Sequence, residues 1–178
     1  MLRITGGAWR GRRLRPLGGK RVRPTESRVR QALLQIWAHA GLLDAPFLDL
    51  FAGSGIMALE ALSRGVPRAV SIEAERAACA RMRRIQAEWG VERWTILCGR
   101  LPAALRRIAG ARFGVVFADP PYRSDEAERI PGWLDAHGIG CAELAIELPA
   151  DEGFAAPRGW RVADLRRWGG SAVVRLVR

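Results

Sequence analysis

Short apolar runs alternate with longer amphipathic segments along most of this 178-residue chain. The runs have the length and composition of buried strands, and the segments between them repeat apolar residues at helical spacing. Strands and helices that alternate in this way form a parallel sheet with helices on both faces. The sequence therefore predicts an α/β fold. The expected strands are 46–51, 68–73, 94–98, 113–118, 142–148, 160–165 and 172–177, and the expected helices are 23–41, 55–65, 74–90, 101–110 and 124–138.

The two ends of this pattern depart from strict alternation. The last two strands follow each other without a helix and are joined through Gly169 and Gly170, which predicts an antiparallel hairpin at one edge of a mostly parallel, seven-stranded sheet. At the start of the first helix, Thr25 follows a proline and is the expected N-cap, and Gly41 is expected to end the helix.

Positive charge is concentrated at the N-terminus. The net charge is +11, yet residues 1–30 contain ten bases and one acid, so this segment alone carries +9. A basic block beside a near-neutral body is typical of a protein that binds a polyanion, and nucleic acid is the first candidate. The alternative is a solvated tail. Paired glycines and "RRLRPL" favour a hairpin instead, with Trp9 expected to pack it onto the body.

The chain is therefore expected to consist of a basic hairpin arm, residues 1–24, and one larger domain, residues 25–178. No apolar run is long enough for a membrane span, and the first residues lack the apolar core of a secretory signal, so we expect a cytoplasmic protein. Cys79, Cys98 and Cys141 are far apart, as are the two histidines, which favours reduced thiols and no metal site. We expect a monomer.

A glycine-rich loop follows the strand at 46–51. Gly53 and Gly55 stand between that strand and a helix, and Glu73 lies twenty residues after Gly53 at the end of the next strand. This spacing indicates a Rossmann-like site for an adenosine-containing cofactor, with Glu73 on the ribose. Asp49, inside the strand, is unfavourable beside a pyrophosphate. It suits a cofactor with a cationic amino-acid end, such as S-adenosylmethionine, better than NAD.

A second motif, Asp119-Pro120-Pro121-Tyr122, follows the strand at 113–118. In an open α/β sheet the site lies at the carboxyl ends of the central strands, so this motif should face the glycine loop. The Asp119 carboxylate and the Pro120 carbonyl can accept hydrogen bonds from an exocyclic amino group, and Tyr122 can stack on the base. An ionised carboxylate only accepts, which favours the donor-only edge of guanine over that of adenine.

With these residues identified, the chain resembles the RsmD family of bacterial rRNA guanine-N2 methyltransferases along nearly its whole length. The matching stretches are "RITGGAWRGRRL", "RPTESRVRQAL", "LDLFAGSGIMALEALSRG", "FADPPY", "AIELP" and "RRWGGSAVVRL". The resemblance implies a class I S-adenosylmethionine-dependent methyltransferase that acts on N2 of a guanine in 16S rRNA, within an assembled or partly assembled 30S particle.

The resemblance and the motifs together give three sets of candidate residues. The base-binding, catalytic set is Asp119, Pro120, Pro121 and Tyr122. The cofactor set is Asp49, Phe51, Ala52, Gly53, Ser54, Gly55, Glu73, Ala74, Arg100 and Leu101, the last two standing where many methyltransferases place an acid or amide near the adenine. The RNA-binding set is Arg3, Arg10, Arg12, Arg13, Lys20, Arg21, Arg23, Thr25, Arg28 and Arg123. Glu147 either orients the site or faces solvent.

Three other functions compete with this interpretation. An N6-adenine methyltransferase on DNA or RNA is disfavoured by Asp119 in place of Asn and by the lack of a large target-recognition domain. A non-catalytic RNA-binding or ribosome-assembly protein would not need the intact acids and glycines of the site. An NAD-dependent oxidoreductase would need an acid–base pair that the sequence lacks.

Overall fold

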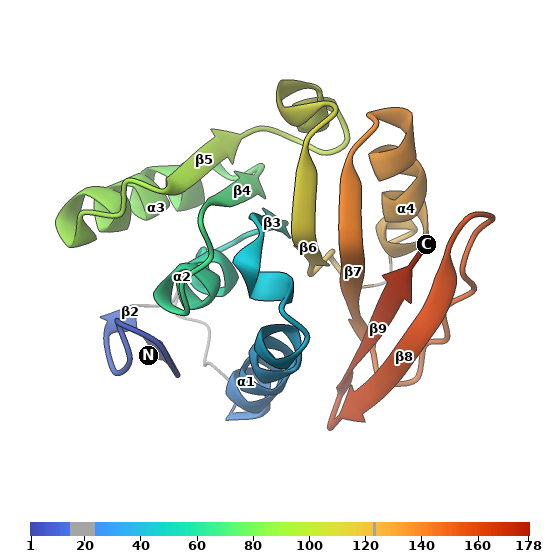
Figure 1. Cartoon of the computed structure of the whole chain (residues 1–178), viewed down its shortest axis with the longest axis horizontal. Helices are drawn as coiled ribbons and strands as arrows, with labels where there is room; N and C mark the ends of the chain where they lie inside the picture. The colour runs from blue at the N-terminus through green and yellow to red at the C-terminus, as the bar shows by residue number, and fades with distance from the viewer. Residues whose placement is uncertain (15–23, 123) are drawn as a thin grey trace.

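The computed structural model describes residues 1–14, 24–122 and 124–178, and these contain a twisted seven-stranded sheet (Figure 1). Its strand order is β5-β4-β3-β6-β7-β9-β8. The pairings from β5 to β7 are parallel, and β9 is antiparallel to both β7 and β8. The strands are β3 Phe47–Leu50, β4 Ala69–Glu73, β5 Trp94–Cys98, β6 Arg112–Ala118, β7 Gly140–Pro149, β8 Arg161–Trp168 and β9 Ser171–Val177. The predicted sheet and its antiparallel edge are confirmed.

The helices fall close to the predicted positions. They are α1 Pro24–His39, α2 Ile56–Ser63, α3 Arg76–Trp89 and α4 Glu126–Ala136, with the 3-10 turns η2 Leu42–Asp44 and η3 Ala103–Ile108. Helix α1 begins at Pro24, so Thr25 lies inside the helix and the prediction of Thr25 as N-cap is wrong, because proline is well suited to the first turn of a helix. The predicted helix at 101–110 is reduced to the six-residue η3. Within the described residues, no helix is long and apolar enough to cross a bilayer.

The sheet separates two hydrophobic clusters, because successive strand residues point to opposite faces. In β6, Val115 and Phe117 join the cluster of α1, α2 and α3, whereas Val116 and Ala118 join the cluster of α4 and η3. Apolar residues fill both faces, as expected for a parallel sheet that is covered on both sides. This double cover leaves the ends of the strands as the place for a site.

The N-terminal hairpin packs against α2 and is part of the first cluster (Figure 1). Its strands, β1 Leu2–Arg3 and β2 Arg13–Leu14, are antiparallel. Leu2, Ile4 and Leu14 are buried with residues of α1 and α2. Gly7 has a φ of 77°, and a Cβ there would lie 1.8 Å from the Ser63 carbonyl oxygen, so only glycine permits this close approach.

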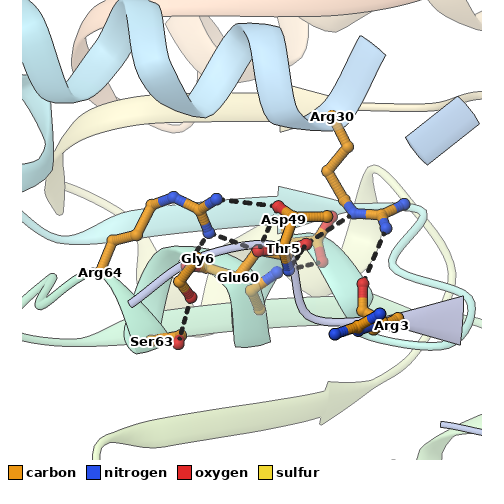
Figure 2. A network of polar contacts seen from close by, with 9 residues as sticks. Arg3, Thr5, Gly6, Arg30, Asp49, Glu60, Ser63 and Arg64 are labelled. Carbon is orange, nitrogen blue, oxygen red and sulfur yellow. Dashed lines mark hydrogen bonds and ion pairs between the residues drawn. The ribbon is translucent and has the colours of Figure 1, made fainter. Parts of the chain in front are cut away.

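A buried carboxylate, Glu60 of α2, binds the hairpin to the body (Figure 2). One of its oxygens, Oε1, accepts hydrogen bonds from the Thr5 backbone N–H at 2.9 Å and from Arg30 Nε at 3.0 Å. The other forms an ion pair with Arg64. Arg30 also donates to the Arg3 carbonyl at 3.1 Å. Because Glu60 is fully buried, its charge depends on these partners.

Figure 2 also places Ser63 of α2 beside the loop of the hairpin. The Ser63 hydroxyl donates to the Gly6 carbonyl at 2.7 Å and accepts from the Trp9 backbone N–H at 2.9 Å. The Trp9 ring packs edge-on against Trp89 at the end of α3, with 6.0 Å between ring centroids. The expectation that Trp9 packs the hairpin onto the body is confirmed.

We predict that Glu60→Gln lowers the free energy of unfolding by about 3 kcal/mol, because the substitution leaves the buried Arg30 and the partly buried Arg64 without a counter-charge. Amide hydrogen exchange in residues 1–14 should accelerate more than exchange in the central strands. Urea unfolding and exchange mass spectrometry measure these effects. The control is Glu88→Gln, which neutralises an exposed glutamate of α3. Equal stability of the two variants would contradict the role given to Glu60.

Candidate active site

The glycine loop continues β3 through a strained backbone. Phe51 has a φ of 58°, which is rare for a non-glycine residue, and Gly53 and Gly55 have φ values of 52° and 73°. A Cβ on Gly55 would lie 2.5 Å from the Trp94 ring, so this position excludes any side chain. Backbone strain of this kind is concentrated at functional sites. The loop residues Ala52 and Ser54 complete the tight turn before α2.

Glu73 lies at the end of β4 and reaches this loop. Its Oε2 accepts a hydrogen bond from the Gly53 backbone N–H at 2.7 Å, and its Oε1 accepts one from the Glu75 N–H at 2.7 Å. The twenty-residue spacing therefore corresponds to a direct contact. Each carboxylate oxygen has a second lone pair, so Glu73 can still accept bonds from hydroxyl groups of a ligand.

Asp49 is buried, with 2% of its surface exposed, on the side of β3 that faces α2. It accepts a hydrogen bond from the Ala58 backbone N–H at 3.3 Å. Burial is the main cause that raises the pKa of Asp49 to about 8, and the negative charges of Asp119 and Glu73 contribute to this rise against the opposing effect of the Ala58 bond. Asp49, Glu73 and Asp119 thus form a cluster of three acids around the ends of β3, β4 and β6. Such a cluster favours a cationic ligand.

The Asp-Pro-Pro-Tyr motif lies beside the glycine loop, as predicted. In the parallel pairing of β3 with β6, Leu50 is opposite Ala118, and the Asp119 backbone N–H donates to the Leu50 carbonyl at 3.4 Å. Asp119 is exposed, whereas Pro120 is buried and fixes the turn. Pro121 is exposed, so the motif presents an open surface to a substrate.

Tyr122, the last residue of the motif, has a half-exposed side chain. Its hydroxyl lies 3.0 Å from Ser171 Oγ and donates to Glu147 Oε1 at 3.4 Å. Glu147 therefore contacts the last residue of the motif. Ser171 was not a sequence candidate, because the matching stretch "RRWGGSAVVRL" in which it lies does not indicate a contact with Tyr122.

The residues that the sequence predicts near the adenine, Arg100 and Leu101, follow β5. This strand is next to β4 on the side away from β3 and its glycine loop. The Gly99 backbone N–H donates to the Glu73 carbonyl at 2.8 Å, which brings the segment after β5 to the end of β4. There Arg100 is exposed and Leu101 is half-buried, and Ala74 is exposed directly after Glu73. The structure thus places these residues at the carboxyl ends of the strands, where the glycine loop also lies.

The candidate RNA contacts divide into described and undescribed residues. Those with described, exposed side chains are Arg3, Arg10, Arg12, Arg13 and Arg28. Arg12 lies over the Trp89 ring, 5.0 Å from its centroid. Lys20, Arg21, Arg23 and Arg123 lie outside the described residues, and only the backbone of Thr25 is described.

Sequence reasoning missed the residues that hold the hairpin in place. Glu60 is an acid within the otherwise apolar stretch "MALEAL" of α2, and a charge on a helix that is buried all round is a signal of an internal partner. The partners themselves, Thr5 and Arg30, carried no such signal. Among the described residues, no group of three or more potential ligands could hold a metal ion, and all three cysteines are free.

The strand order, the antiparallel last strand and the glycine loop define the class I S-adenosylmethionine-dependent methyltransferase fold. The protein SMU.776, solved as a complex with SAH, shares this fold with a TM-score of 0.66 and 11% identity over 88% of this chain and 50% of that protein. The Escherichia coli protein yhhF is more similar, with a TM-score of 0.85 and 31% identity over 99% of this chain and 97% of its own.

The sequence comparisons identify the family within this class. The model of the family described as "Conserved hypothetical protein 95" matches residues 2–174. Ribosomal RNA small subunit methyltransferase D of Escherichia coli is 33% identical over 162 residues, which cover 89% of this chain and 81% of that protein. The protein of the same name from Haemophilus influenzae is 27% identical over 89% and 84%. This chain belongs to that family, the RsmD family.

The raised pKa of Asp49 makes the free energy of unfolding depend on pH. The unfolded chain ionises Asp49 near the ordinary value of 3.8, whereas the folded protein retains the proton until about pH 8. Between these values the unfolded state binds fewer protons, so stability attributable to Asp49 falls as the pH rises.

We predict that Asp49→Asn, which has no proton to lose, becomes more stable relative to the natural protein as the pH rises between about 5 and 8. The difference should grow by at most about 1.4 kcal/mol per pH unit. Urea unfolding of both proteins across this range measures the difference. A difference that stays constant with pH would contradict a protonated Asp49 in the folded state.

Proposed function

We propose that this protein transfers a methyl group from S-adenosylmethionine to the exocyclic N2 of a guanine in small-subunit rRNA. The observation that carries this proposal is the arrangement of Asp49, Glu73 and Asp119 around a glycine loop at the ends of three adjacent strands. The names of the Escherichia coli and Haemophilus influenzae relatives support rRNA as the substrate class.

The residues at the loop fit S-adenosylmethionine. Bound there, this cofactor supplies an electrophilic methyl group on a positively charged sulfur. Glu73 has lone pairs for the ribose hydroxyls, and the missing side chain at Gly53, where a Cβ would meet nothing closer than 4.0 Å, allows the ligand to approach the backbone. Asp49 and its acidic neighbours suit a ligand with positive charge, because a nearby cation favours the ionised carboxylate. Arg100 and Leu101 are proposed to border the adenine, and Phe51 and Ala74 to complete the pocket.

The Asp119 segment supplies the chemistry at the base. The lone pair of an exocyclic amino group is delocalised into the ring, so the nitrogen is a poor nucleophile. Hydrogen bonds from its two N–H groups to the Asp119 carboxylate and the Pro120 carbonyl would localise that lone pair and direct it toward the methyl donor. The exposed ring of Tyr122 would stack on the base after the base leaves its helix.

The N-terminal hairpin and the start of α1 are proposed to grip the RNA. Arg10, Arg13 and Arg28 are exposed to solvent. The buried Arg30 differs from them, because it forms an ion pair with Glu60. Exposed arginines on a hairpin can follow a phosphate backbone. We propose that folded RNA within a 30S particle, assembled or partly assembled, is recognised by shape.

We predict that small-subunit particles lacking the modification gain label from methyl-labelled S-adenosylmethionine, and that nucleoside analysis finds the label in N2-methylguanosine. Asp119→Ala should lower kcat by at least about a hundredfold, since it removes an acceptor that acts on the reacting nitrogen. Binding of S-adenosylhomocysteine to this variant, measured by calorimetry, should remain. Label in N6-methyladenosine, or no label in particles and free rRNA, would refute the proposal.

The same assay separates RNA binding from chemistry. The double variant Arg10→Gln/Arg13→Gln should raise KM for the particle several-fold at physiological salt and leave kcat unchanged, because phosphate contacts contribute uniform binding. The control, Arg106→Gln/Arg107→Gln, removes the same charge from exposed arginines of η3. An equal effect of the two pairs would contradict a specific role for the hairpin.

A further inference from the structure

The hydroxyl group of Tyr122 is held by two residues from the far edge of the site. Glu147 belongs to β7, and Ser171 is the first residue of β9. The antiparallel register of these strands places Pro149 opposite Ser171, so both partners lie at the end of β7 that faces the motif. Tyr122 keeps 49% of its surface exposed, so these contacts restrain the ring without covering it.

The direction of the hydrogen bonds follows from the chemistry of the groups. The Glu147 carboxylate only accepts, and the phenol has one hydrogen, so Tyr122 donates to Glu147. The Ser171 hydroxyl, 3.0 Å away, then donates to the phenol oxygen. Burial raises the pKa of Tyr122, the Ser171 bond lowers it, and the charge of Glu147 raises it. The phenol therefore keeps its proton at neutral pH.

The turn between β8 and β9 fixes the position of Ser171. The Ala150 backbone N–H donates to the Gly170 carbonyl at 3.1 Å, and Arg167 Nε donates to the Ala150 carbonyl at 2.9 Å. Gly169 adopts a φ of 60°, which closes the turn. These bonds attach the turn to the end of β7 and thereby fix the position of Ser171 beside Tyr122.

We propose that Ser171 and Glu147 are positioning residues that hold the Tyr122 ring in the orientation in which it stacks on the target base. This inference rests on the proposed function, because it needs a base at Tyr122. A half-exposed tyrosine without these bonds can rotate among its side-chain rotamers, and each misplaced orientation costs catalytic rate. Neither residue needs to touch the base for this role.

The hydrogen bonds can be tested without activity, because Tyr122 is the single tyrosine of the chain. Its ionisation is therefore read directly by absorbance titration, or by NMR of protein labelled with ¹³C-tyrosine. Ser171→Ala should raise the pKa of Tyr122, since it removes a donor, and Glu147→Gln should lower it, since it removes a negative charge. Ser171→Thr keeps the hydroxyl and is the control. An unmoved tyrosine pKa in both variants would overturn the proposal.

The effect on catalysis is tested by a double-mutant cycle. Single-turnover methyl transfer with saturating cofactor should fall roughly tenfold in Ser171→Ala, as for the loss of one hydrogen bond, and at least as much in Tyr122→Phe, which loses both bonds. The double variant should be no slower than Tyr122→Phe, and Ser171→Thr should restore the rate. Losses that multiply in the double variant, or a fully active Ser171→Ala, would overturn the proposal. Inactive natural protein with the expected tyrosine shifts would instead refute the proposed function.

Discussion

The parallel pairing of β3 with β6 is the constraint on which the rest of the site depends. These strands are distant in sequence, and their register sets Leu50 opposite Ala118, so that the glycine loop and the Asp119 segment leave the sheet side by side. The apolar residues of both strands are buried on both faces, and a slip by one residue would turn Asp49 toward the opposite cluster. The packing of the sheet thus determines the distance between cofactor and base in the proposed reaction.

A second constraint is the buried carboxylate of Glu60, which connects the helix after the glycine loop to the basic hairpin. Helix α2 begins at the glycine loop, where Asp49 accepts a bond from Ala58, and holds the hairpin through Glu60 and Ser63 at its other end (Figure 2). One short helix therefore contacts both proposed ligand surfaces. The cost of burying Glu60 is offset by two arginines, so the hairpin is held at a fixed place rather than attached as a loose tail.

The sequence was sufficient for the sheet, the glycine loop and the Asp-Pro-Pro-Tyr motif, because each depends on local periodicity or on a short motif with a physical role. Glu73 was found through its spacing, and its contact with Gly53 is observed. Ser171 and the partners of Glu60 were not found, since Tyr122 and Ser171 are 49 residues apart and Thr5 and Glu60 are 55 apart. Such pairs meet only through tertiary packing. Helix α1 starts at Pro24 and not after Thr25, because the first turn of a helix favours proline.

The most direct measurement of the central claim is calorimetric titration with two bisubstrate compounds. In one, the methionine part of the cofactor is linked to guanosine through N2, and in the other to adenosine through N6. The account predicts that the N2-linked compound binds at least about tenfold more tightly, a difference of about 1.4 kcal/mol, and that Asp119→Ala removes this preference. Equal or tighter binding of the N6-linked compound would contradict a guanine site formed by Asp119 beside the glycine loop.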